Sequence, residues 1–173
     1  MDANSRVVLV GPRASGKSTV GALLAARLAV SFVDTDRLVE EEAGRSIAEV
    51  WADFREREAR VLDRVLKAGP AVVAAGGGAV LWDGFASAAR GWTVVWLDAA
   101  PETLARRIRS DPRVRPSLTG RPPHEEIGDV VRSRAPRYAA VARIRVETDR
   151  LGADAVVEEI VHCLRAGGRG KAD

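Results

Sequence analysis

One eight-residue segment, Gly11-Pro-Arg-Ala-Ser-Gly-Lys-Ser18, constrains the fold of this 173-residue chain more than any other feature. It satisfies the pattern G-x-x-x-x-G-K-[ST], which is meaningful only between a strand and a helix. Residues 6–10 form a short apolar run typical of a strand that is covered on both faces. Residues 18–28 carry apolar side chains at close to helical spacing. The sequence therefore predicts strand, glycine-rich loop and helix in succession.

The rest of the chain continues this alternation. Further strands are predicted at 31–34, 71–75, 93–97 and 143–147, and further helices at 37–42, 47–52, 56–67, 102–109, 126–140 and 153–164. Strands alternating with helices predict an α/β fold, a three-layer sandwich in which helices flank a five-stranded parallel sheet. The length suits one domain, residues 1–165. We expect the Gly-rich, charged tail, 166–173, to be disordered.

Composition narrows the class of partner. The chain has 27 Lys plus Arg and 24 Asp plus Glu, so its formal charge is 27 − 24 = +3, and its pI is near 9.6. The basic residues are mostly Arg scattered among acidic residues, without a dense basic run, so no nucleic-acid partner is expected. There is a single cysteine, Cys163, and no apolar window approaches membrane-spanning length. We expect a cytoplasmic monomer that acts on small anionic molecules, without membrane contact.

The glycine-rich loop has a direct chemical use. Its successive backbone N–H groups and the start of the following helix attract phosphates, Lys17 adds a positive charge, and the Ser18 hydroxyl can ligate Mg²⁺. GTPases, motors and small-molecule kinases share such loops, so the loop predicts a nucleoside triphosphate but no particular reaction. The chain lacks an Asn-Lys-x-Asp segment for guanine and has little room for the accessory parts of a motor. A compact kinase is the leading class.

Further polar and glycine residues lie just past the predicted strands. Asp34 and Asp36 follow the second strand, and Gly76-Gly-Gly78 follows the third. In parallel sheets ligands bind at the carboxyl ends of strands. One carboxylate can hold Mg²⁺ through water while the other orients an attacking hydroxyl, and the glycines admit a ligand close to the backbone. The alternative interpretations are helix N-caps for the aspartates and a plain strand-to-helix turn for the glycines.

Together these segments resemble the shikimate kinases. The resemblance rests on Gly11 to Ser18, Asp34-Thr-Asp36, Gly44-Arg-Ser-Ile47, Gly76-Gly-Gly-Ala79, Arg115-Pro116 and Arg134-Ala-Pro-Arg-Tyr138, in this order and approximate spacing. It runs from Val7 to about Leu164. It implies a fold like that of nucleoside monophosphate kinases, ATP and Mg²⁺ as cofactors, and phosphorylation of the 3-hydroxyl of shikimate. It also implies a lid at about 110–125 and substrate-binding helices at about 37–68.

The resemblance assigns roles residue by residue. The catalytic residues would be Lys17, Asp36 and Arg115. ATP would be bound by Gly11, Ala14, Ser15, Gly16, Lys17, Ser18, Thr19, Arg107, Arg109, Arg115 and Arg150. Shikimate would be bound by Asp36, Arg60, Gly77, Gly78 and Arg134, with the two arginines gripping its carboxylate. Mg²⁺ would be held by Ser18 and, through water, by Asp34.

The chain also departs from the family pattern. Where the family usually has Phe-Arg-x-x-Glu, residues 59–63 read Ala-Arg-Val-Leu-Asp; Trp51 replaces a smaller aromatic residue; and the lid has Ser117 in place of leucine. A reshaped pocket leaves open a kinase for another small polyol or cyclic acid, such as a gluconate-like or cyclitol-like acceptor. A non-catalytic nucleotide-binding module is a third hypothesis. The presence of Lys17 and Asp36 disfavours it.

Overall fold

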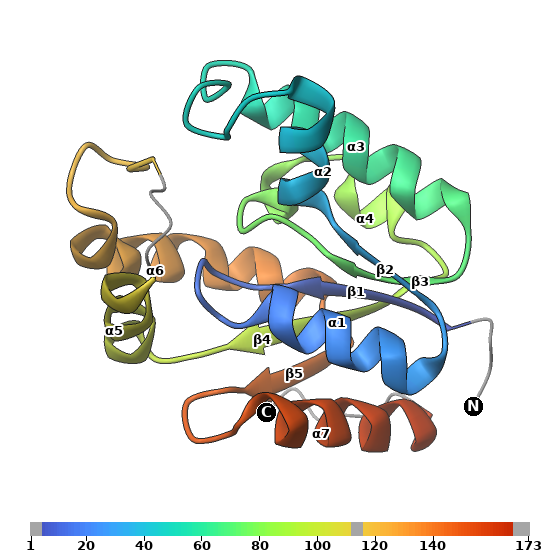
Figure 1. Cartoon of the computed structure of the whole chain (residues 1–173). Coiled ribbons are helices and arrows are strands. Elements are labelled where there is room, and N and C mark those ends of the chain that lie inside the picture. The colour runs from blue at the N-terminus through green and yellow to red at the C-terminus, as the bar shows by residue number, and fades with distance from the viewer. Residues whose placement is uncertain (1–4, 112–115, 168–173) are drawn as a thin grey trace.

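A five-stranded parallel sheet forms the centre of the protein (Figure 1). The computed structural model describes residues 5–111 and 116–167. Every strand pairs in parallel with its neighbours, in the order β2-β3-β1-β4-β5. The strands are β1 Arg6–Val10, β2 Ser31–Asp34, β3 Ala71–Ala74, β4 Thr93–Asp98 and β5 Ile144–Glu147. The predicted α/β class and five-stranded parallel sheet are confirmed.

Seven α-helices and one 3-10 turn accompany the strands in the described parts of the chain. They are α1 Lys17–Leu28, α2 Thr35–Ala43, α3 Phe54–Ala68, η1 Ala79–Leu81, α4 Phe85–Ala88, α5 Pro101–Ser110, α6 Pro123–Val141 and α7 Ala153–Arg165. Six predicted helices lie within or overlap these elements. None of the helices in these described stretches is both long and apolar enough to cross a bilayer.

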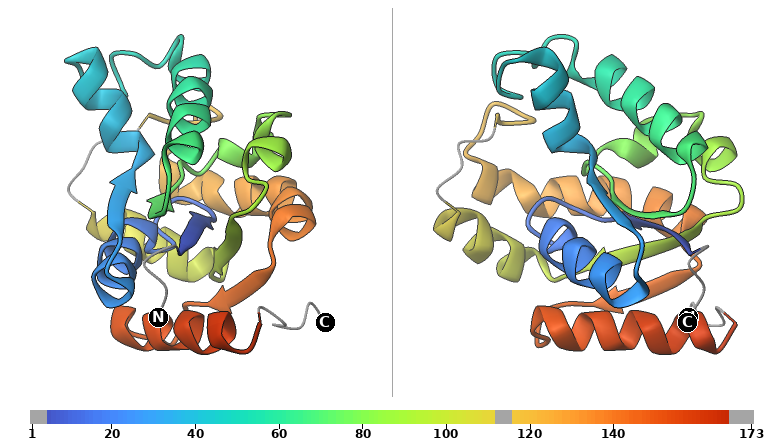
Figure 2. Two further views of the ribbon diagram at one scale, coloured as in Figure 1. Left: turned by 90° about the vertical axis from the view of Figure 1, so that its right-hand side faces the viewer. Right: turned by 45° about the vertical axis from the view of Figure 1, so that its right-hand side comes forward.

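The helices cover the sheet on both faces, as Figures 1 and 2 show from three directions. On one face α1 and α7 bury a cluster against the alternate side chains Val7 and Leu9 of β1. On the other face α3, α4 and α6 pack against Val8 and Val10 of the same strand. Because successive side chains of a strand point to opposite faces, the continuous apolar run of β1 fills both layers.

The predicted helix 47–52 is wrong. These residues form consecutive turns, in which the N–H groups of Glu49 and Val50 both donate to the carbonyl of Ser46. Gly44 ends α2 in the left-handed conformation at φ 61°, so the chain changes direction before this segment. A helix of six residues gains little from its own hydrogen bonds, and here the packing of Val50 and Trp51 against the core fixes the turns.

Candidate active site

The loop between β1 and α1 has the geometry that phosphate binding needs. A side chain at Gly11, where φ is 145°, would place its Cβ 2.3 Å from the carbonyl oxygen of Leu97, so only glycine fits there. Gly16 and Ala14 also adopt left-handed φ values, 95° and 64°. Lys17 Nζ donates to the carbonyls of Gly11 at 2.9 Å and Pro12 at 2.8 Å, which keeps its ammonium over the loop.

Asp34 stands at the junction of β2 and α2 and serves two elements. Its Oδ1 accepts hydrogen bonds from the N–H groups of Asp36 and Arg37, so it caps α2. Its Oδ2 accepts from the Ser18 hydroxyl at 2.5 Å. The capping interpretation is therefore correct, and it is compatible with a metal role because hydroxyl and carboxylate oxygens are ligands that suit Mg²⁺. No group of three or more metal-ligating side chains occurs within 5–111 and 116–167.

Thr35 ties the acidic segment to the glycine run. Its buried hydroxyl donates to the carbonyl of Ala74 at 3.3 Å and accepts from the N–H of Gly76 at 3.1 Å. Asp36 thereby lies beside Gly76, where an added Cβ would come within 2.5 Å of Asp36 Oδ1 and 1.9 Å of Glu58 Oε1. The first glycine of the run is required by this close approach, so the run is more than a plain turn.

A cleft of about 700 Å³ opens at the carboxyl ends of the strands. The expected site residues that line it are Ala14, Gly16, Lys17, Ser18, Thr19, Asp34, Asp36, Gly77, Gly78, Arg107 and Arg134. The loop, the acidic pair, the glycine run and two arginines thus face one space, as the strand-end rule predicts. Gly11 and Ser15 belong to the same loop but do not line the cleft.

Arg134 and Tyr138 hold the glycine run from the side of α6. The Arg134 guanidinium donates to the carbonyl of Gly77 at 2.9 Å, and the Tyr138 hydroxyl donates to the same oxygen at 2.6 Å. Burial raises the pKa of Tyr138 to about 12, so its hydroxyl keeps its proton and stays a donor. Tyr138 was not predicted as a site residue, although it lies in the quoted motif 134–138.

Arg60 does not reach the cleft, and this corrects the sequence-based assignment. Its side chain is 72% exposed and pairs with Glu56 on the outer side of α3. Arg55 lines the cleft instead, together with Phe54 and Trp51. The signal was present five residues earlier than expected, because Phe54-Arg-Glu-Arg-Glu58 reads Phe-Arg-x-x-Glu in full. The supposed departure at residues 59–63 therefore does not exist.

Three neighbours hold the Arg55 guanidinium. Its Nη1 donates to Glu58 Oε2 at 2.6 Å, and its Cζ lies 5.5 Å and 5.8 Å from the ring centroids of Phe54 and Trp51. The two rings are stacked 5.5 Å apart, so Trp51 adds a second aromatic face beside the guanidinium. A Cβ at Gly78 would come within 2.0 Å of Arg55 Nη1.

Glu58 is a buried acid beside the glycine run, with 3% of its side chain exposed. Burial raises its pKa, and the Asp36 charge adds to the rise, while Arg55 and Arg134 oppose it; the net direction is upward. Asp36, Glu58, Arg55 and Arg134 therefore form one coupled charge cluster beside the glycine run. Sequence reasoning missed Glu58 as well as Arg55, although an acid on the apolar stripe of a helix is a usable signal.

Of the four arginines expected at the nucleotide end, three lie in the described residues and differ in placement. Arg107 lines the cleft, donates to the carbonyl of Ala14 at 3.3 Å and to both the hydroxyl and carbonyl of Thr148, and so joins the phosphate loop to the loop after β5. Arg109 is exposed and does not line the cleft. Arg150 lies in a separate hollow beside Arg145. The position of Arg115 falls outside the described residues.

Comparison with known proteins agrees with this geometry. A family model described as shikimate kinase matches residues 13–165. A shikimate kinase of Symbiobacterium thermophilum is 44% identical over 94% of this chain and 97% of its own length. The structure of shikimate kinase from Acinetobacter baumannii in complex with shikimate superposes with a TM-score of 0.87 at 30% identity, covering 98% of this chain and 97% of that one.

A more distant likeness concerns the fold alone. A gluconokinase from Sinorhizobium meliloti superposes with a TM-score of 0.65 at 20% identity, over 97% of this chain and 95% of that one. At this identity the likeness supports the shared fold and says nothing about the acceptor. With the family model spanning most of the sequence and a 44% identical relative spanning nearly all of it, this chain belongs to the shikimate kinase family.

Proposed function

We propose that this chain transfers the γ-phosphoryl group of ATP to the 3-hydroxyl of shikimate. One observation carries the proposal: Lys17 of the phosphate loop, Asp36, Arg55 and Arg134 line a single cleft. One end of this cleft can bind a triphosphate, and the other end carries two guanidiniums. This arrangement suits phosphoryl transfer from a nucleotide to a small hydroxylated carboxylate.

The acceptor end accounts for recognition of a carboxylate. Arg55 and Arg134 present planar, permanently charged forks, which bind a carboxylate bidentately and disfavour neutral polyols. Gly77 and Gly78 line the same cleft, so their backbone groups can face the acceptor. In this proposal Arg55 takes the role that the sequence analysis gave to Arg60.

Asp36 is proposed to orient the acceptor hydroxyl and accept its proton as the new P–O bond forms and the bond to the leaving ADP breaks. Phosphoryl transfer needs mainly positioning and charge stabilisation, so one carboxylate suffices. Lys17 and Arg107 would neutralise charge on the phosphates. Arg115, carried by the lid of residues 110–125, would act on the transferring group, and closure would exclude water.

Mg²⁺ is proposed to bind at Ser18, with Asp34 in its outer shell. The 2.5 Å contact between the two side chains brings a hydroxyl and a carboxylate oxygen together beside the phosphate loop. When bound, the ion would supply positive charge that offsets the charge of the phosphates. We further propose that the enzyme acts as a cytoplasmic monomer.

The hypothesis of a different acceptor loses its basis. It rested on the altered residues Ala59 and Asp63, but Phe54, Arg55 and Glu58 carry the unaltered pattern. Asp63 pairs with Lys67 at 2.6 Å on the same helix and does not line the cleft. No observation now favours a gluconate-like or cyclitol-like acceptor over shikimate.

The test is to identify the product. The protein is incubated with ATP, Mg²⁺ and shikimate, and the product is examined by ³¹P and ¹H NMR, which locate the phosphoryl group by its coupling to the ring proton. We expect a monoester at the 3-position and one ADP for each molecule formed. Hydrolysis of ATP without any phosphorylated shikimate would refute the proposal.

A further inference from the structure

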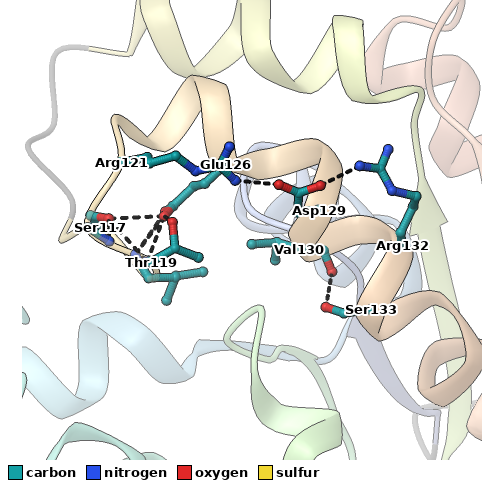
Figure 3. A network of polar contacts seen from close by, with 10 residues as sticks. Ser117, Thr119, Arg121, Glu126, Asp129, Val130, Arg132 and Ser133 are labelled. Carbon is teal, nitrogen blue, oxygen red and sulfur yellow. Dashed lines mark hydrogen bonds and ion pairs between the residues drawn. The ribbon is translucent and has the colours of Figure 1, made fainter.

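Residues 116–120, Pro-Ser-Leu-Thr-Gly, are held by a buried carboxylate of α6; we call them the anchored segment. The acid is Glu126, which is 1% exposed. Its two oxygens accept hydrogen bonds from the Ser117 hydroxyl at 3.0 Å, the Leu118 N–H at 2.9 Å, and the Thr119 N–H and hydroxyl at 2.8 Å each. Figure 3 shows the Glu126 side chain pointing into this turn.

The network keeps the carboxylate charged. Burial raises the pKa of Glu126, but the hydrogen bonds from Leu118, Thr119 and Ser117 together outweigh it, and the net direction is downward. A buried charge is tolerated when its lone pairs are filled in this way. The charge in turn strengthens each hydrogen bond, so the turn is tied firmly to the helix.

Ser117 closes the same turn from within. Its Oγ accepts from the N–H groups of Thr119 at 3.2 Å and Gly120 at 2.7 Å, while its hydroxyl donates to Glu126. The leucine that is usual in the family at this position can make none of these side-chain bonds. The departure at Ser117 is therefore matched to Glu126 rather than being a neutral change.

Two other contacts extend the attachment. Arg121, directly after the anchored segment, pairs with Asp129, one helical turn beyond Glu126 (Figure 3). At the other end, both Nη atoms of Arg13 in the phosphate loop donate to the carbonyl of Pro116 at 3.1 Å. The segment is thus attached to α6 and to the phosphate loop at once.

The anchored segment forms part of the wall of the cleft. Pro116 and Leu118 line the cleft. Arg13, which holds Pro116, has its backbone nitrogen 3.4 Å from the Cβ position of Gly77, at the edge of the acceptor end. An apolar proline and leucine held next to the phosphate loop can limit the access of water to the transferring group.

We propose that Glu126 and Ser117 are positioning residues which fix Pro116 and Leu118 as a wall of the cleft and so direct the phosphoryl group to the acceptor instead of water. The activity part of this inference rests on the proposed function. When the wall is loosened, a water oxygen forms the new P–O bond, ADP leaves as before, and phosphate replaces phosphorylated shikimate.

The first measurement needs no substrate. Hydrogen exchange of the full-length protein is followed by mass spectrometry in peptides covering 116–122, for wild type, Glu126→Ala and the control Glu125→Ala, whose side chain is exposed. Loss of hydrogen bonds to a charged acceptor should speed exchange by about 10-fold or more in Glu126→Ala, and leave Glu125→Ala unchanged. Unchanged exchange in Glu126→Ala would overturn the anchor.

The second measurement is the number of phosphorylated shikimate molecules formed per ADP. We expect a ratio near one for wild type and Glu125→Ala, a fall below about one half for Glu126→Ala, and a KM for shikimate raised about 10-fold. A role confined to stability would lower the melting temperature and leave the ratio alone. A folded Glu126→Ala protein with faster exchange but an unchanged ratio and KM would overturn the positioning role.

Two further arms keep the outcome clear. If Glu126→Ala does not fold, Ser117→Ala takes its place, because it keeps the carboxylate and removes three of the turn's hydrogen bonds. This variant should show both the faster exchange and the lower product ratio, each more weakly. If it shows neither, the proposal is refuted. If the wild type itself does not phosphorylate shikimate, the proposed function fails, while the exchange measurement still decides whether Glu126 anchors the segment.

Discussion

Arg55 donates to Glu58 at 2.6 Å across one turn of α3, and the two side chains differ sharply in exposure, 42% for the base and 3% for the acid. The acid is fixed in the core, and the base extends from it into the cleft. Stacking of Phe54 and Trp51 against the guanidinium limits its remaining freedom. The arrangement presents a charged fork whose orientation is set before a ligand arrives.

The first prediction compares two arginines of the same helix. Arg55→Ala should raise the KM for shikimate about 10- to 100-fold, because hydrogen bonds to a charged carboxylate are lost, and leave the KM for ATP unchanged. Arg60→Ala removes an exposed ion pair and should leave both constants near wild type. Steady-state kinetics of the two variants decide this. An effect confined to Arg60→Ala would restore the earlier assignment.

The second prediction concerns Gly78, whose missing side chain makes room for Arg55. A Cβ there would lie 2.0 Å from Arg55 Nη1, so the guanidinium must move in Gly78→Ala. We expect the KM for shikimate to rise about 10-fold with little loss of stability, since the end of a flexible side chain can shift. Gly128→Ala on α6, where the new atom makes only ordinary contacts, is the matched control. Equal kinetics for both variants would contradict the explanation.

The third prediction follows from the raised pKa of Glu58. A folded-state pKa above the ordinary value of 4.5 means that the protonated acid stabilises the fold below about pH 4.5, and that this stability is lost as the pH rises through the folded-state pKa. Glu58→Gln has no such loss. We therefore expect the difference in free energy of unfolding, Glu58→Gln minus wild type, to increase between about pH 4 and pH 7 when it is measured by urea titration. A difference that falls with rising pH would show that the pKa is lowered instead.

The fourth prediction separates chemistry from folding at the phosphate loop. Lys17→Ala should reduce phosphoryl transfer on the order of 10³-fold, because a charge aimed at the phosphates is lost. The melting temperature should change little, since Lys17 makes its described contacts to loop carbonyls. Lys67→Ala, which removes an exposed lysine from α3, should keep full activity. Full activity in Lys17→Ala would refute the role assigned to it.

The fifth prediction tests the backbone at the end of α1. Ala29 ends this helix with φ 57°, a conformation that costs an L-residue about 1 kcal/mol and glycine almost nothing. Ala29→Gly should therefore stabilise the protein by about 1 kcal/mol. Ala22→Gly, at an exposed position inside the same helix, should destabilise it by a similar amount. Chemical denaturation of both variants gives the sign of the change in the free energy of unfolding. If both variants are less stable than wild type, the interpretation is contradicted.

Much of the fold could be predicted because its signals are local. The apolar run of β1 ends at a glycine-rich loop that admits few conformations, β3 and β4 are further short apolar runs, and β5 alternates apolar and charged residues. Asp34, Asp36 and Gly76 could be selected in the same way, because they follow strands whose carboxyl ends meet at one edge of the sheet.

Contacts between distant segments could not be predicted. In α3 the sequence alternates Arg55, Glu56, Arg57 and Glu58 before Arg60, so several registers of an Arg-Glu pattern are available. The complete Phe-Arg-x-x-Glu pattern at 54–58 indicates one of them, and the packing shows that Arg55 is the arginine that faces the cleft. Burial of Phe54 and Glu58 on the same stripe as the apolar residues of α3 fixes the register. The partnership of Glu126 with Ser117 likewise depends on a turn that folds back onto α6.

The most direct test of the central claim is kcat/KM for the wild-type protein with saturating ATP and Mg²⁺, measured side by side with shikimate and gluconate as acceptors. The proposed function predicts phosphorylated shikimate and ADP in equal amounts. Because Arg55 and Arg134 could hold the carboxylate of either acid, the expected preference for shikimate, at least about 100-fold in kcat/KM, would come from the fit of its ring in the cleft. Turnover with shikimate no faster than ATP hydrolysis alone, or a preference for gluconate, would contradict the account.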